Sequence, residues 1–153
     1  MRRTGISKKS KTPLAKAKTK LWKVLKQVID IRDGEVCISC GAEGLKGQNK
    51  HGGHFIPSSS CGGFLRYDLR NVWVQCSTCN LFRNGAGAEY TRALEKKYTV
   101  KFVDRIILDK RETIKLDVDY VEALTAYYES LLTLDKKALI ELTKNYKGFK
   151  NDS

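Results

Sequence analysis

The chain has 153 residues, enough for one hydrophobic core and short for two, and its 29 Lys and Arg against 17 Asp and Glu give a formal charge of +12. Because no apolar run is long enough to cross a membrane and the N-terminus lacks the apolar segment of a signal peptide, we exclude a membrane or secreted protein and expect a soluble, cytoplasmic one. The excess of positive charge favours a polyanionic partner, with nucleic acid as the first candidate.

The first predicted region is a basic, flexible arm over residues 1–12. Neither Asp nor Glu occurs in residues 1–27, whereas Lys and Arg recur throughout. Lys8, Lys9 and Lys11 are the candidate contacts of this arm with a phosphate backbone. Lysine runs are also common on solvated surfaces, so the arm alone does not identify the partner.

A helix is predicted over residues 13–32, because Thr12 is a favourable N-cap, Pro13 suits the first turn and apolar residues then recur at helical spacing. Residues 36–79 are rich in Gly, Ser and aromatic residues and have little helical period. They predict short strands over residues 54–56 and 72–75, joined by a loop. We therefore expect an irregular centre that follows a long helix.

Helical periodicity returns after this centre. Short helices are predicted over residues 77–83 and 88–98, Asp117 and Asp119 are placed to begin another, and Asp135 caps a last helix that ends near Tyr146. An apolar stripe in this region predicts core packing, with dimerisation as the alternative; it consists of Val121, Leu124, Tyr128, Leu131 and Leu132.

The predicted organisation is therefore a single domain in three parts. These parts are the arm (residues 1–12), a first helix with the central core (residues 13–98) and a helical extension (residues 99–153).

The cysteines point to a metal. Four of the five form two C-x-x-C pairs, Cys37 with Cys40 and Cys76 with Cys79, and such pairs in a reducing compartment indicate metal binding before disulfides. Four thiolates make a closed tetrahedral zinc site, which is structural because no position is left for a substrate. Cys61 has no partner in this pattern, and is either a bystander or a replacement ligand.

Further motifs surround these pairs. The stretch HGGHFI lies between them, Asn71 follows in LRNV, and Asn80 comes directly after Cys79. The order C-x-x-C, G-H-F, Asn, C-x-x-C-N resembles the HNH nucleases, whose ββα-metal unit is a hairpin followed by a helix. More closely, IDIRDGEVCISCG, GGHF, LRYDLRNVWVQCSTCN and GAGAEYTRAL are similar to the phage NinG/Rap recombination nuclease family. The resemblance spans about residues 29–94.

This resemblance implies a fold and an activity. The expected fold is α+β, a zinc-stapled HNH core with flanking α-helices. The expected activity is metal-dependent hydrolysis of DNA at branched recombination intermediates such as Holliday junctions, D-loops and flaps, inside the bacterial host if the chain is phage-encoded. A homodimer, and phage or host recombination proteins, are the further partners that it implies.

By position, the resemblance also assigns roles to residues. His54 is the general base, for which an imidazole pKa near neutrality is suited, and Asn71 orients the hairpin that holds it. Asn80 occupies the place of a ligand to a catalytic Mg²⁺ or Mn²⁺, as in endonuclease VII-like members, and Asn84 follows one helical turn later as a second candidate ligand.

In one respect the chain departs from the HNH pattern. Many of these enzymes have an Asp ligand immediately before the base, where this chain has Gly53. His51, Asp68 and Glu89 are candidates for the missing ligand, and water or phosphate oxygens are another possibility. Four arginines that flank the motif are candidate phosphate contacts: Arg66, Arg70, Arg83 and Arg92.

Three hypotheses remain open beside the branch-specific nuclease. They are a general HNH nuclease, a zinc-stabilised DNA-binding protein without catalysis, and an RNA-binding zinc-ribbon protein. The missing Asp supports the second of these most directly.

Overall fold

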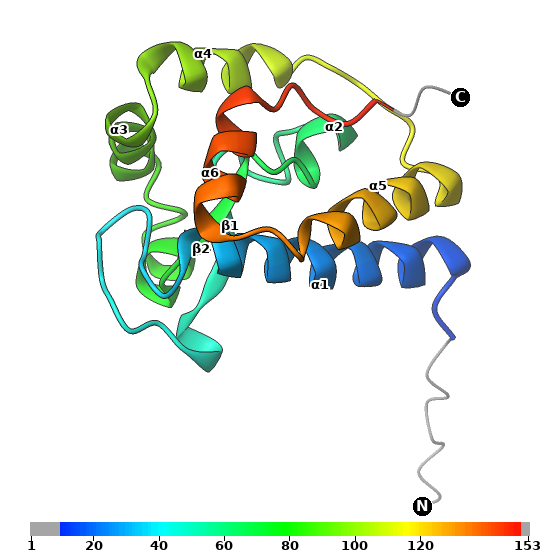
Figure 1. The fold of residues 1–153 in the computed structure, drawn as a ribbon, viewed down its shortest axis with the longest axis horizontal. Coiled ribbons are helices and arrows are strands. Elements are labelled where there is room, and N and C mark those ends of the chain that lie inside the picture. The colour runs from blue at the N-terminus through cyan, green and yellow to red at the C-terminus, as the bar shows by residue number, and fades with distance from the viewer. Residues whose placement is uncertain (1–9, 151–153) are drawn as a thin grey trace, which may run out of the picture.

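The computed structural model describes residues 10–150, whose helices surround a small two-stranded sheet (Figure 1). In chain order the elements are α1 (Pro13–Asp33), the 3-10 helix η1 (Gly47–Asn49), β1 (His51–His54), α2 (Gly63–Arg66), β2 (Val72–Gln75), the π-helix η2 (Thr78–Phe82), α3 (Gly87–Lys97), α4 (Val100–Asp109), α5 (Val118–Leu131) and α6 (Lys136–Asn145). The fold is thus mixed and rich in helix.

Helix α1 begins and ends close to where the sequence predicts. The hydroxyl of Thr12 accepts a hydrogen bond from the Ala15 amide at 3.2 Å, and Pro13 occupies the first turn, where its missing amide costs nothing. At the other end Gly34 has a φ of 67° and donates its amide to Asp30, a conformation that suits glycine because it has no Cβ.

Most of the core lies between α1 and the C-terminal helices. Helix α5 runs alongside α1, and α6 packs on α1 as well (Figure 1). Leu25 of α1, Tyr128 of α5 and Leu139 of α6 are buried in one cluster, which includes Val72 and Val74 of β2. The predicted apolar stripe is thus confirmed as core, and the helical extension shares that core with the first helix.

A second apolar cluster involves α3 and α4. It contains Trp73 of β2, Tyr90 and Leu94 of α3, and Val103 and Ile106 of α4. Because neighbouring side chains of a strand point to opposite faces, β2 contributes alternately to both clusters. The hairpin therefore lies between the α1 side and the α3–α4 side of the molecule.

The hairpin itself is antiparallel. His51 pairs with Gln75 and His54 with Val72, so β1 begins three residues earlier than the predicted strand, whereas β2 has the predicted bounds. Helix α4 is not predicted from the sequence as a separate element, although its apolar residues recur at helical spacing. Val103 and Ile106 are buried there, while Leu108 is 61% exposed.

A buried ion pair joins the end of α1 to the hairpin. The Arg32 guanidinium binds the Asp33 carboxylate at 2.6 and 2.9 Å and donates to the carbonyls of Leu69 and Val72. It also stacks over the Trp73 ring, and Asp33 accepts the Val74 amide at 3.0 Å. Each of the three guanidinium nitrogens of Arg32 thus has at least one acceptor, as a buried charge requires.

Within residues 10–150, no helix has both the length and the apolar character that crossing a membrane requires.

Candidate functional site

Four cysteines converge beside the hairpin. The sulfurs of Cys37, Cys40, Cys76 and Cys79 all lie within 4.8 Å of one another. A tetrahedral zinc ion with bonds of about 2.3 Å separates its sulfur ligands by about 3.8 Å, and the Cys40 and Cys76 sulfurs are 3.8 Å apart. The geometry therefore fits a metal ion such as zinc, with four protein ligands and no open position.

The local backbone prepares the cysteines for this role. The Gly41 amide donates to the Cys37 carbonyl at 3.0 Å, and Gly41 has a φ of 75°, which closes the turn beneath the first pair. In the second pair the Asn80 amide donates to the Cys76 carbonyl at 3.0 Å. Burial, with hydrogen bonds from neighbouring cysteines, raises the pKa of Cys79, so a metal must displace a proton there.

Two contacts attach the cysteine cluster to the hairpin. The Ile38 amide donates to the Val74 carbonyl at 2.9 Å, and the Gln75 side-chain amide donates to the Ser39 hydroxyl at 2.7 Å. These two hydrogen bonds therefore connect the backbone around the first cysteine pair to β2.

His51 and Asn80 form a pair at the cysteine end of the hairpin. The side-chain nitrogen of Asn80 lies 3.0 Å from His51 Nδ1, and His51 Nε2 lies 2.7 Å from the Gln48 carbonyl. A carbonyl only accepts, so Nε2 carries the proton and Nδ1 keeps its lone pair. Rotating the Asn80 amide by half a turn places its oxygen beside that lone pair, and the two acceptors then converge as ligands of a cation do.

His54 lies in a different environment from this pair. Its Nε2 donates to the Arg66 carbonyl at 2.8 Å, and its ring stacks on Trp22 of α1 with centroids 5.3 Å apart. Burial lowers the pKa of His54, aided by the nearby Arg66 charge and opposed by the Arg66 carbonyl. The imidazole is thus neutral near pH 7, and Nδ1 holds the free lone pair of a base.

The structure does not join His54 to Asn80. His54 follows His51 by three positions in β1, so the two histidine side chains point to opposite faces of the hairpin. A Cβ on Gly52 would lie 3.1 Å from Trp22, which confirms that Gly52 and His54 share the α1 face. Trp22 is a neighbour of His54 that sequence reasoning missed, because only the packing of α1 on the hairpin brings them together.

Asn71 fastens the segment directly after β1. It is fully buried, its side-chain oxygen accepts the Ile56 amide at 2.7 Å, and its side-chain nitrogen donates to the carbonyls of Ile56 and Leu65. Its own carbonyl accepts the Phe55 amide at 2.8 Å. These bonds hold the backbone just after β1 to the backbone just before β2. Such contacts are what an orienting role for Asn71 requires.

The space in front of Gly53 explains the absent Asp. A Cβ at this position would lie 1.9 Å from the side-chain oxygen of Gln75, and the Gly53 carbonyl accepts the Tyr90 hydroxyl at 2.7 Å. An acidic side chain here would have to displace the buried Gln75 side chain. Sequence reasoning also missed Gln75, for which the only signal is its place directly before Cys76.

Asp68 and Glu89 are placed less favourably than His51 to supply the missing ligand. Asp68 is buried, and each of its two carboxylate oxygens accepts a hydrogen bond of 2.9 Å from the Arg70 guanidinium. Glu89 is exposed on α3. Asn84 lies beyond the end of η2 with a φ of 48°, so the expectation that it continues one helical turn after Asn80 is wrong.

The predicted phosphate contacts within the described residues are either exposed or, in the case of Arg70, buried. Arg66, Arg83, Arg92 and Lys11 are exposed, whereas Lys8 and Lys9 lie outside the described residues. Arg70 is 1% exposed and binds Asp68 and Asp109, which contradicts a role in holding phosphate. A guanidinium with two buried carboxylate partners has neither the access nor the free charge for DNA.

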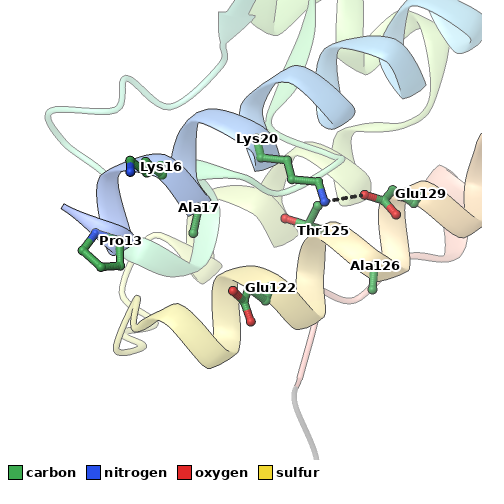
Figure 2. Close-up of a pocket in the computed structure, with 8 residues that line it drawn as sticks. All are labelled: Pro13, Lys16, Ala17, Lys20, Glu122, Thr125, Ala126 and Glu129. Carbon is green, nitrogen blue, oxygen red and sulfur yellow. Dashed lines mark ion pairs between the residues drawn. The ribbon is translucent and has the colours of Figure 1, made fainter. Parts of the chain in front are cut away.

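Two further features lie away from the candidate residues. Cys61 is not part of the four-sulfur group, and its thiol approaches the Ser58 carbonyl instead. A pocket of about 410 Å³ lies between α1 and α5, where Lys20 and Glu129 form an ion pair of 3.5 Å (Figure 2). Its lining carries mixed charge and none of the candidate site residues.

Comparison with known proteins identifies the family. Searches of curated proteins and of solved structures found no match to the chain. The family model described as bacteriophage lambda NinG protein matches residues 2–138, which is most of the chain. The chain therefore belongs to the NinG protein family.

Proposed function

We propose that this chain is a metal-dependent endonuclease that hydrolyses phosphodiester bonds of DNA, and that it acts at branched recombination intermediates. The observation that carries the proposal is the hairpin, which bears a neutral histidine with a free lone pair at one end and the His51–Asn80 pair beside the cysteine cluster at the other. Family membership supports it further.

In this proposal the cysteine cluster binds zinc and has a structural role. The four sulfurs leave no position for a substrate, and the Ile38 and Gln75 hydrogen bonds couple the cluster to β2. Cys37, Cys40, Cys76 and Cys79 would hold the zinc, which would tie β2 to η2 and so help to position His51 against Asn80. The core would then correspond to an HNH ββα unit in which η2 takes the place of the helix.

His51 and Asn80 would hold the catalytic ion. They offer one imidazole nitrogen and one amide oxygen, and water and phosphate oxygens fill the other positions, as Mg²⁺ tolerates. When bound, Mg²⁺ or Mn²⁺ supplies charge that polarises the scissile phosphate and stabilises the leaving oxygen. Residues of the chain would accept the proton and hold the DNA backbone.

His54 would accept the proton of the attacking water. Its Nε2 is held by the Arg66 carbonyl, so Nδ1 is the basic atom, and the Trp22 ring fixes the plane of the imidazole. Arg66, Arg83 and Arg92 would hold the phosphate backbone on either side, because all three are exposed.

A cleavage assay tests this proposal. Zinc-loaded protein is incubated with four-way, flapped and linear DNA of equal length in Mg²⁺ or Mn²⁺, and variants His54→Ala and Asn80→Ala are compared with the wild type. We expect cleavage of branched DNA to fall by about 100-fold or more in both variants while binding survives, because a base acts mainly in the transition state. Asn145→Ala, on an exposed position of α6, is the matched control and should cleave normally. Wild-type turnover by His54→Ala would refute the assignment of the base.

One observation favours a second candidate, a DNA-binding protein without catalysis. His54 and Asn80 point to opposite sides of the hairpin. Among the described residues, no carboxylate forms a hydrogen bond or ion pair with either side chain. In that case the wild type binds all three DNAs and cleaves none, although elemental analysis finds its zinc. Equal cleavage of the three substrates would instead leave a general nuclease.

A further inference from the structure

Two large apolar side chains lie exposed directly after the candidate ligand Asn80. Phe82 is 80% exposed, the highest value among the large hydrophobic residues that the structure describes, and Leu81 is 59% exposed. Both belong to η2, whose Cys79 is buried on the inner side among the cysteines. Neither side chain contributes to the two apolar clusters, so folding alone does not explain them.

The backbone that carries these side chains is firmly held. The Arg83 amide donates to the Thr78 carbonyl and the Gly85 amide to the Cys79 carbonyl, both at 2.9 Å. Asn84 and Ala86 have φ values of 48° and 50°, a left-handed conformation that is uncommon for residues other than glycine and that alanine keeps only where the surroundings impose it. The Phe82 ring is thus presented from a fixed support beside the cysteine cluster.

The size of this surface limits what it can bind. A stable protein interface buries about 800 Å² on each partner, whereas the exposed patch consists of two consecutive side chains. The other large exposed apolar residues of the described chain lie on α4 or before Cys37. One flat ring is, however, the platform on which a single nucleobase stacks.

Charge points to the same ligand. Arg83 is the next residue and is exposed, and the chain as a whole carries +12. An aromatic face with a cation beside it matches a nucleotide, whose base stacks while its phosphate contacts the guanidinium. In continuous duplex the bases are already stacked on one another, whereas a branch point offers bases that have lost a neighbour.

We propose that Phe82, with Leu81 beside it, is a stacking platform for an unstacked base at the branch point of a DNA junction. This inference rests on the proposed function and deepens it, because it names the feature of the DNA that the site recognises. Arg83 holds the adjoining phosphate.

The test measures binding and base environment, not cleavage. A four-way junction carrying the fluorescent adenine analogue 2-aminopurine at its branch point is titrated with zinc-loaded protein, in buffer without added Mg²⁺ or Mn²⁺. We expect stacking on Phe82 to change the fluorescence of the analogue. Phe82→Ala should remove that change and weaken junction binding by about 10-fold, in line with the contribution of one stacked base. Binding to linear duplex should change less than about twofold.

Two variants separate stacking from general apolar contact. Phe82→Trp keeps a flat ring and should retain both the fluorescence change and the affinity. Phe82→Leu keeps apolar area without the ring and should behave like Phe82→Ala. Leu108→Ala is the matched control, because Leu108 is 61% exposed on α4 and away from η2, and it should leave junction binding unchanged.

Four outcomes overturn the inference. Unchanged junction binding and fluorescence in Phe82→Ala overturn it alone if the wild type still binds and cleaves branched DNA. An equal loss on linear duplex rejects the branch point as the target. A change of molar mass between the wild type and Phe82→Ala, measured by light scattering, assigns the patch to self-association instead. A wild type that binds no DNA overturns the proposed function as well.

Discussion

The helical frame, formed by α1, α5 and α6, and the central segment, residues 34–86, reach an ordered structure by different means. The frame buries apolar side chains such as Leu25, Tyr128 and Leu139 in one cluster. The central segment has two four-residue strands and short helices. It also buries apolar side chains, such as Leu69 and Trp73, but polar contacts and the four cysteines add to its cohesion. The residues of the candidate site therefore lie on the segment that adds polar contacts and a possible metal site to the burial of apolar side chains.

Loss of the metal should produce the largest difference between the two regions. We expect a chelator, or Cys76→Ser, to disorder the central segment, because structural zinc contributes about 10 kcal/mol or more to small zinc modules. The frame should keep most of its helical signal in far-ultraviolet circular dichroism, while the fluorescence of Trp73 shifts on exposure. Cys61→Ser is the control, since Cys61 is outside the four-sulfur group, and it should keep both the metal and the stability.

Breaking the ion pair that joins frame to centre should have the next largest effect. In Arg32→Met the Asp33 carboxylate stays buried without its partner, so the free energy of unfolding should fall by about 3–5 kcal/mol in urea denaturation. The double variant with Asp33→Asn should recover part of this loss. Arg66→Met, at an exposed position, should change stability by less than about 0.5 kcal/mol. A loss below about 1 kcal/mol in Arg32→Met would contradict this account.

A smaller effect is expected from filling the space in front of Gly53. The new Cβ of Gly53→Ala meets the Gln75 side chain at 1.9 Å, and overpacking of this kind costs about 1–3 kcal/mol. Adding Gln75→Ala should relieve most of the cost. In Gly87→Ala the Cβ meets nothing within 4 Å, so thermal melting should show little change. Equal melting temperatures of the two alanine variants would rule out the steric explanation.

The smallest expected effect is a dependence of stability on pH. Because burial lowers the pKa of His54 in the folded protein, the unfolded chain binds the proton more readily. The contribution of neutral His54 is fully present above the unfolded pKa of about 6.5 and is lost as pH falls towards the lowered folded value. Urea denaturation at a series of pH values should show a shallower slope in His54→Gln than in the wild type. Parallel slopes would mean that burial does not perturb this group.

Local signals made the frame easier to predict than the centre. Thr12 before Pro13 marks the start of α1, and Asp135 caps α6 by accepting the Ala138 amide at 2.8 Å, both as predicted. Caps and periodicity depend on neighbours in the chain, so a single sequence contains them. The bounds of β2 are predicted for a similar reason, since turn residues flank a short apolar run.

The candidate site could be predicted only in part. C-x-x-C spacing is a local signal, and the clustering of the four cysteines confirms it. The burial of Arg70 and the stacking of Trp22 on His54 depend on Asp109 and on the packing of α1, which are distant in the chain. The His51–Asn80 contact depends on the register of the hairpin against η2, which no spacing rule reveals. The proposed catalytic roles themselves stay predictions.

The packing of α1 against α5 and α6 also has a consequence for folding during synthesis on the ribosome. The apolar face of α1 emerges before the helices α5 and α6 that cover it, because the whole central segment is translated between them. The cysteines leave the ribosome well before α5 does, so metal can be captured while Leu21 and Leu25 are still uncovered. A fragment that ends before residue 118 would therefore expose the apolar face of α1 even with metal bound, and would be prone to aggregate until α5 and α6 are made.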